Sequence, residues 1–294
     1  MPLDLIKLAR PSQWVKNGVV LAAAVFAGEV GDPAKMETAL AATLIFCLLS
    51  SAVYVLNDLI DRDKDKIHPL KKDRPVASGR VSIATAIVFA AVLAGSGFVS
   101  ALFIDRMFLL FAVIFVVVNL LYSLLLKNVV IVDVMTLAFS FVVRAYAGAV
   151  AVEVVASKWL LINTLLLALF LGFGKRRHEL VLLESEAVAH RKSLSNYSPY
   201  LLDQLIGVTT ASVVVMYMLY SFSDEVSAKL GTQNLYVTIP FVVYGIFRYL
   251  YLIHRRQEGG SPTKVLYTDR PLLLTVLLWL MTVIIVLYYV SRHT

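Results

Sequence analysis

Long apolar stretches without an acidic or basic residue recur along the whole chain. Six of them are Thr38–Asn57, Val81–Ile104, Met107–Leu126, Trp159–Gly174, Gln204–Ser223 and Pro271–Ser291. A helix rises about 1.5 Å per residue, so about 20 apolar residues cross the hydrocarbon core of a bilayer. Each stretch is therefore predicted to be a membrane-spanning helix.

Three further stretches fit this pattern less cleanly. Asn17–Gly28 is short, Asn128–Val152 contains Asp133 and Arg144, and Asn234–Ile253 contains an arginine. Together the stretches predict an all-α polytopic membrane protein, a bundle of nine transmembrane helices forming a single domain over residues 1–294. Residues 4–17 are predicted to form an amphipathic helix that lies at the interface and leads into the first span.

The polar segments between the spans are unequal in length. Long connections are predicted at 58–80, 175–203 and 254–270, whereas the others are short. If the amino terminus is cytoplasmic, most of the 27 Lys and Arg residues fall on the cytoplasmic side, as the positive-inside rule requires. We therefore expect a multi-pass protein of the bacterial cytoplasmic membrane with its functional site in the cytoplasmic loops.

Composition supports this class. The chain is 59% hydrophobic and 16% charged, against about 25% charged residues in soluble proteins. Inner loops that face anionic membrane lipids or phosphorylated ligands account for the net charge of +7, so nucleic-acid binding is not needed to explain it. The single cysteine excludes an intrachain disulfide.

Four oxygen-bearing side chains are spaced for one helix face at the end of the second span. Asn57, Asp61 and Asp65 follow at intervals of four, and Asp58 precedes Asp61 by three. Stacked like charges destabilise a helix, so a cation should offset them. Mg²⁺, with Mn²⁺ as the alternative ion, suits these ligands when phosphate oxygens complete its shell. The competing interpretation is a solvated polar loop neutralised by Lys and Arg.

Basic residues follow this acidic segment closely. Lys72 and Arg74 are near enough in sequence to fold back over the same site, where both would bind phosphate. The alternative is positive charge that only sets the topology.

The acidic pattern, the basic Arg-Pro segment after it and the nine predicted spans resemble the UbiA superfamily of intramembrane prenyltransferases. The resemblance implies that Asn57, Asp58, Asp61 and Asp65 bind the diphosphate of a donor through Mg²⁺, with the three aspartates catalytic. It also implies that Tyr122, Lys127 and Asp133 face the same diphosphate.

The chain departs from those prenyltransferases where they carry a second aspartate-rich motif. Here the sequence Gly172–Glu179 has three consecutive cations, and Glu179 is its only acid. With the segments Arg10–Asn17 and Gly259–Pro271, this resembles the decaprenyl-phosphate phosphoribosyltransferase branch. The resemblance implies phosphoribosyl diphosphate as donor, a polyprenyl phosphate as acceptor, and a product used for cell-wall arabinan.

Several cations are candidates for binding the substrate phosphates. Lys175 and Arg177 join Lys72, Arg74 and Lys127 in this role, although Lys175 and Arg177 could equally be topogenic charge. Arg144 lies in mid-span, where a charge is costly and normally faces the bundle interior. It shares a helix face with Asp133 but lies about 16 Å from it, so each must find partners on other helices or on a ligand.

Three rival functions remain at this stage. A prenyltransferase with a prenyl diphosphate donor and a small acceptor is disfavoured by the missing second acidic motif. A transporter would show broken helices and charges near the centre of several spans. A structural scaffold leaves the three aspartates unexplained. Polyprenyl length, homo-oligomer formation and metal count stay open.

Overall fold

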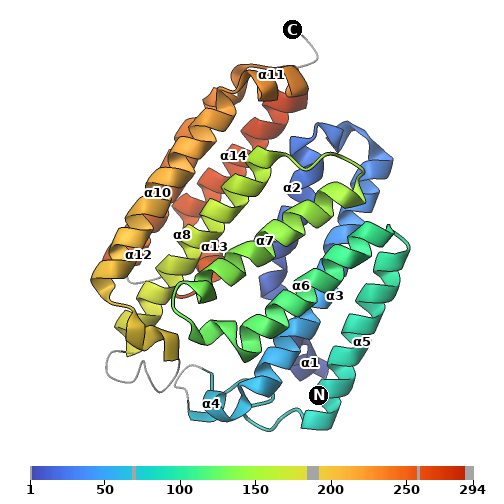
Figure 1. Ribbon diagram of the computed structural model, residues 1–294, viewed down its shortest axis with the longest axis vertical. Coiled ribbons are helices and arrows are strands. Elements are labelled where there is room, and N and C mark those ends of the chain that lie inside the picture. The colour runs from blue at the N-terminus through green and yellow to red at the C-terminus, as the bar shows by residue number, and fades with distance from the viewer. Residues whose placement is uncertain (1, 68–70, 184–191, 257–258, 289–294) are drawn as a thin grey trace.

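The computed structural model describes residues 2–67, 71–183, 192–256 and 259–288, and these residues form helices, turns and no strand (Figure 1). Eight helical segments are long and apolar enough to cross a membrane. They contain α3 (Pro33–Ile60), α5 (Ile83–Leu102), α6 (Arg106–Leu124), α7 (Val132–Ala151), α8 (Lys158–Leu183), α10 (Pro199–Ser221), α12 (Ile239–Arg255) and α14 (Arg270–Tyr288). The predicted all-α membrane fold is confirmed.

The predicted count of nine spans is not confirmed. The segment Asn17–Gly28 contains α2 (Gly18–Phe26), which has only nine residues. Its helical length of about 14 Å is half of what a bilayer core requires. The end of the predicted last span, residues 289–291, lies outside the described residues.

The amino-terminal segment is broken where one amphipathic helix was predicted. It forms α1 (Pro2–Ala9) and the 3₁₀ helix η1 (Pro11–Asn17), with Arg10 between them at a φ of 52°. Pro11 explains the break, because a proline disfavours the right-handed helical conformation of the residue before it. The second piece packs on α3, where Trp14 Nε1 donates to Ser51 Oγ at 3.0 Å.

Close packing between α2 and α7 holds this segment inside the bundle. A Cβ atom on Gly148 of α7 would lie only 2.1 Å from the carbonyl oxygen of Val20 in α2. Val20 belongs to a buried cluster with Phe46 of α3 and Phe115 of α6. The lack of a side chain at Gly148 therefore lets α2 pack against α7 at backbone distance.

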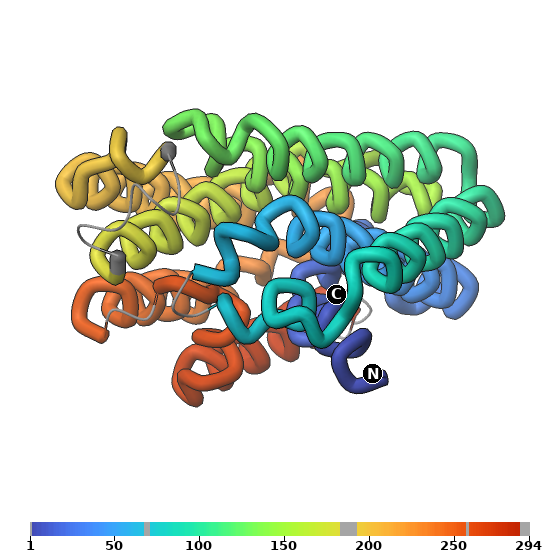
Figure 2. The backbone as a smooth tube through the Cα atoms, turned by 90° about the horizontal axis from the view of Figure 1, so that it is seen from below, coloured from blue at the N-terminus to red at the C-terminus, as the bar shows by residue number. Residues whose placement is uncertain are grey.

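One end of the bundle carries most of the non-spanning structure. α1, α4 (Arg62–Ile67) and the turns of residues 71–80 lie there, and α11 (Asp224–Leu230) lies at the opposite end (Figure 1). Figure 2 views the molecule from the α4 end and shows the segment after α3 crossing this face. η3 (Leu126–Asn128), η5 (Lys192–Asn196) and α13 (Pro262–Thr268) complete the non-spanning elements that bear on the site.

The predicted loop at 175–203 is shorter in the structure, because the helix before it continues into it. α8 runs nine residues beyond the predicted end of its span at Gly174. Ion pairs of Glu179 with Lys175 and Arg176, four and three residues earlier, favour this extension. Of the predicted loops, residues 68–70, 184–191 and 257–258 lie outside the described part of the chain.

Candidate functional site

The acidic segment sits where α3 ends. α3 carries Asn57 and Asp58, Asp61 caps it, and Asp65 lies in α4. Backbone hydrogen bonds still connect Asp61 N to Asn57 O at 2.9 Å and Asp65 N to Asp61 O at 2.8 Å. The helical spacing therefore persists across the end of α3. Asp58 and Asp65 are buried, at 2% and 3% exposure, whereas Asp61 is partly open.

Basic side chains from one neighbouring and two distant segments pair with these carboxylates. Arg74 Nη1 donates to Asp58 Oδ1 at 2.9 Å and to Asp65 Oδ2 at 2.7 Å. Lys127 Nζ donates to Asp61 Oδ1 at 2.6 Å, and Arg10 also pairs with Asp58. Burial lowers the pKa of Arg10, and the Asp58 carboxylate opposes that shift.

Only one of the two basic residues expected to fold back does so. Arg74 reaches the carboxylates, whereas the Lys72 side chain is exposed. The expected contact of Lys72 with a phosphate stays a prediction. Arg10 was missed as a site residue, because forty-eight positions separate it from Asp58 and no local pattern connects them. The Arg10–Asn17 motif was the one signal that could have found it.

The oxygen ligands fit a divalent ion that is shared with a ligand, but they do not form a closed cage. Among the described residues, no three His, Cys, Asp or Glu side chains are grouped to hold a metal. The predicted set of Asn57, Asp58, Asp61 and Asp65 is thus not assembled as a complete metal site. Asn57 Oδ1 is buried without a hydrogen-bond partner. Mg²⁺ commonly takes one or two carboxylates and completes its shell with phosphate oxygens and water, which this donor set permits.

A second buried ionic network lies between α7 and α8. Arg176 and Asp133 are both fully buried, and Arg176 Nε lies 3.0 Å from Asp133 Oδ2. Arg176 also pairs with Glu179 and lies 3.4 Å from the Tyr122 hydroxyl oxygen. Tyr197, just after η5, donates its hydroxyl proton to Asp133 Oδ1 at 2.7 Å. Burial raises the pKa of Tyr197, and its hydrogen bond to Asp133 adds to the shift.

The arginine inside this network is not one of those that the sequence singled out. Lys175 is partly exposed and lies 3.8 Å from Glu179. Arg177 points toward α10, where it pairs with Asp203, which also contacts His254 Nε2 at 3.1 Å. Lys175 and Arg177 thus have protein partners in the structure, and their expected role in binding phosphate stays a prediction. Spacing in the sequence does not separate Arg176 from Arg177, because they follow Phe173 by three and four residues and both spacings fit one helix face.

Arg144 lies deep in the bundle, and its guanidinium group packs on two aromatic rings. Its guanidinium carbon is 4.6 Å from the centre of the Phe115 ring and 4.7 Å from that of Phe141. Only 5% of the residue is exposed, and Nε and Nη1 have no hydrogen-bond partner. Asp133 and Arg144 thus find separate partners on other elements.

The carboxyl-terminal motif packs against the end of α8. A Cβ atom on Gly260 would lie 2.3 Å from His178 Cδ2, and one on Gly259 would lie 2.9 Å from the Gly174 carbonyl oxygen. Beyond it, Thr263 Oγ1 lies 3.5 Å from Gln13 Oε1 of η1. The three segments that carry the phosphoribosyltransferase resemblance therefore meet in space.

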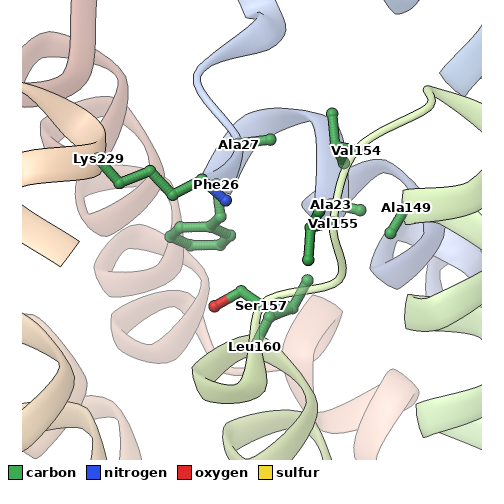
Figure 3. A pocket seen from close by; sticks show the side chains of 9 residues that line it. All are labelled: Ala23, Phe26, Ala27, Ala149, Val154, Val155, Ser157, Leu160 and Lys229. Atoms are coloured by element: carbon green, nitrogen blue, oxygen red, sulfur yellow. The ribbon is translucent and has the colours of Figure 1, made fainter. Parts of the chain in front are cut away.

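A small cavity lies at the other end of the molecule. Its volume is about 10 Å³, and Figure 3 shows Phe26, Val154 and Lys229 among its lining side chains. It lies near α11, at the end opposite α4, and its lining is mostly apolar. It is therefore separate from the carboxylates, whose oxygens suit a metal ion and whose basic neighbours suit a phosphorylated ligand.

Comparisons with known proteins agree with this geometry. Residues 18–268 match the model of the UbiA prenyltransferase family. Decaprenyl-phosphate phosphoribosyltransferase of Mycolicibacterium smegmatis is 32% identical, over 97% of this chain and 92% of its own length. The enzyme of the same name from Mycobacterium tuberculosis is 34% identical, over 95% of this chain and 92% of its own length.

A solved structure is similar over nearly the whole chain. It is a UbiA homolog from Archaeoglobus fulgidus bound to GPP and Mg²⁺. The TM-score is 0.73 with 19% sequence identity, covering 97% of this chain and 99% of that one. At this sequence identity the likeness concerns the fold alone.

Proposed function

Because the chain belongs to the UbiA prenyltransferase family and is an integral membrane transferase, we propose that it transfers 5-phosphoribose from 5-phosphoribosyl 1-diphosphate to a polyprenyl phosphate. Diphosphate is the leaving group. The lipid acceptor is of the decaprenyl phosphate type, and the product is a precursor of cell-wall arabinan.

The observation that supports this proposal is a buried arginine in the segment where, by resemblance, the prenyltransferases carry an acidic motif. Arg176 lies in a network with Asp133 and Glu179 at the end of α8. Exchange of acidic for basic residues in this segment would reduce its capacity for metal ions and make the field around the donor less negative, although Asp133 and Glu179 pair with Arg176. A donor with three phosphates suits that field better than a prenyl diphosphate does. The relatives that are 32–34% identical carry the name of this activity.

The reaction exchanges one C–O bond for another. The bond between ribose C1 and the diphosphate oxygen breaks, and a phosphate oxygen of the acceptor forms the new bond to C1. The acceptor oxygen is already anionic at neutral pH, so no general base is needed. Catalysis therefore rests on positioning and on electrostatic stabilisation of the leaving group.

Each group of residues has a place in that scheme. Asn57, Asp58, Asp61 and Asp65 would hold Mg²⁺ or Mn²⁺ together with the diphosphate. The bound ion would neutralise charge on the leaving group. Arg74 and Lys127, which pair with the same carboxylates, would bind phosphate oxygens directly. Tyr122 and Asp133 contact Arg176 and would fix the position of its guanidinium group.

The membrane arrangement follows from the charge distribution. We place the protein in the bacterial cytoplasmic membrane with its amino terminus and the α4 end in the cytoplasm. The soluble donor would then reach the carboxylates from the cytoplasm, while the apolar tail of the acceptor stays among the membrane lipids. Cysteine labelling at exposed positions of α1 and α11 in intact cells tests this orientation.

Turnover with paired labelled substrates tests the function. Purified protein in detergent is given labelled phosphoribosyl diphosphate or labelled geranyl diphosphate, each with polyprenyl phosphate or an aromatic acceptor. We expect label to enter the lipid only from phosphoribosyl diphosphate and only with Mg²⁺ or Mn²⁺. Transfer of the prenyl label to the aromatic acceptor would instead establish the alternative, a prenyltransferase that uses prenyl diphosphate.

A further inference from the structure

α3 presents a polar face that continues inward from the acidic segment. Cys47, Ser50, Ser51, Tyr54 and Asp58 share this face by helical spacing. Cys47 lies about 16 Å from Asp58 along the helix. A polar face of this length in a membrane bundle requires partners on neighbouring elements.

The amino-terminal segment supplies those partners from one end of the face to the other. Arg10 pairs with Asp58, and its guanidinium carbon lies 5.2 Å from the centre of the Tyr54 ring. Farther inward, Asn17 Nδ2 donates to Cys47 Sγ at 3.3 Å. η1 thus runs along the polar face toward the middle of the bundle and carries Lys16 to the level of Cys47.

Arg144 reaches the same level from α7. Its guanidinium stacks on Phe115, and the Phe115 ring centre lies 5.2 Å from that of Phe46, the residue next to Cys47. Aromatic faces leave the edges of a guanidinium free to donate hydrogen bonds. The Nε and Nη1 atoms are buried and have no such partner. Burying a charged group with unsatisfied hydrogen-bond donors costs free energy unless an anion pairs with it.

Lys16 is part of the same electrostatic environment. Burial lowers the pKa of Lys16 to about 8, and the charges of Arg144 and Arg10 add to the shift. The acid on this face of α3 does not compensate them, because Asp58 is paired with Arg10 and Arg74. Arg144 and Lys16, which we call the deep cation pair, therefore form a positive site with no carboxylate assigned to it.

We propose that the deep cation pair binds a phosphate monoester, farther into the membrane than the carboxylates that bind the diphosphate. This inference rests on the proposed function, in which donor and acceptor each carry one such group: the 5-phosphate of the sugar and the phosphate of the lipid. A prenyl diphosphate carries none. The deep cation pair is thus the feature of this chain that selects phosphorylated sugar chemistry over transfer of an isoprenoid.

Binding measurements with separate probes test the site. Ribose 5-phosphate represents the donor monoester, a short-chain polyprenyl phosphate represents the acceptor, and Mg²⁺ with inorganic diphosphate represents the leaving group. In the variant Arg144→Gln, the Kd for one of the two monoesters should rise about tenfold or more, because a charge-assisted hydrogen bond is lost. The Kd for diphosphate should stay unchanged. The probe that loses affinity identifies the source of the monoester.

Matched variants protect the test from a general loss of folding. Arg248→Gln removes an arginine from α12 that pairs with Asp269 at 2.8 Å, and it should leave the Kd for all probes unchanged. Lys16→Gln should weaken the same monoester as Arg144→Gln, and Arg144→Lys should retain part of the affinity. If Arg144→Gln does not fold, Lys16→Gln provides the decisive measurement. Wild-type affinity for both monoesters in these variants overturns the proposal.

Turnover separates this proposal from the proposed function. If wild-type protein transfers phosphoribose but the variants keep wild-type KM for donor and acceptor, the function stands and the deep site is rejected. If wild-type protein does not transfer phosphoribose but binds a monoester in a manner that depends on Arg144, the site stands and the function is rejected.

Discussion

Arg176 of α8 lies against Asp133 at the start of α7, with 3.0 Å between Nε and Oδ2, and neither side chain is exposed. Removing one member of a buried pair leaves a charge without compensation, which costs about 3–5 kcal/mol. The same contact fixes the start of α7 relative to α8. It therefore links the stability of the bundle to the geometry of its site.

We expect Arg176→Gln to lower the free energy of unfolding by up to about 3–5 kcal/mol, and with it the melting temperature. The measurement uses the single cysteine, Cys47, which is buried and becomes reactive toward a thiol dye on unfolding. Lys175→Gln, at a partly exposed neighbour, should change stability by less than about 0.5 kcal/mol. Equal melting temperatures for the two variants would contradict the structural role of Arg176.

The carboxylate at Asp61 should be essential for turnover. Asp61→Ala removes a carboxylate that we propose as a metal ligand, next to Lys127, and should reduce kcat/KM by about 10²–10³, the range for losing one preorganised electrostatic group. Asp63 offers a matched control, because it is an exposed acid two residues away that pairs with Lys66. Asp63→Ala should behave as wild type in steady-state assays. Near-normal activity of Asp61→Ala would remove the metal assignment.

Metal removal should stop the reaction and weaken donor binding. Only oxygen ligands are present in the acidic segment, so a hard divalent cation is expected to restore both. Activity is measured after treatment with EDTA and again after adding back Mg²⁺ or Mn²⁺. Binding of phosphoribosyl diphosphate followed in parallel should show the same metal dependence. Full activity in excess EDTA is the result that this prediction does not allow.

The part of the site that is local in sequence could be predicted, and the part that depends on packing could not. The helical spacing of Asp58, Asp61 and Asp65 marks one face, and the structure keeps it. Arg10 and Arg176 were missed because their roles come from the direction in which each side chain points. Arg10 turns toward Asp58 at a broken helix, and Arg176 faces inward because α8 continues past its span.

In the fold, too, local features could be predicted from the sequence and features that depend on packing could not. Charge-free stretches located the long helices, since the bilayer sets their length. The short α2 was counted as a span because hydropathy does not report how an element packs. Its position depends instead on a close approach between Val20 and Gly148.

Gly148→Ala should separate α2 from α7 and lower stability. The added Cβ would lie 2.1 Å from a backbone oxygen, so the helices must move, at a cost of about 1–3 kcal/mol or more. Gly207→Ala in α10 is the control, because its Cβ would meet nothing within 4 Å and alanine favours the helix. The thiol-dye assay should therefore give opposite shifts in melting temperature. A stabilised Gly148→Ala variant would show that α2 and α7 are not tightly packed.

Stability should rise with pH through the titration of Lys16. Its pKa is lowered in the folded protein to about 8 from 10.5, so the charged form is less favourable folded than unfolded. Below pH 8 both states carry the proton, and the destabilisation is fully present. Between about pH 8 and 10.5 the unfolded chain binds more protons than the folded protein, so stability increases with pH. The melting temperature of wild-type protein minus that of Lys16→Met should therefore increase from pH 7.5 to pH 10, measured without substrates. A difference that stays constant with pH would mean that Lys16 reaches solvent, and the deep cation pair would then lose one of its two members.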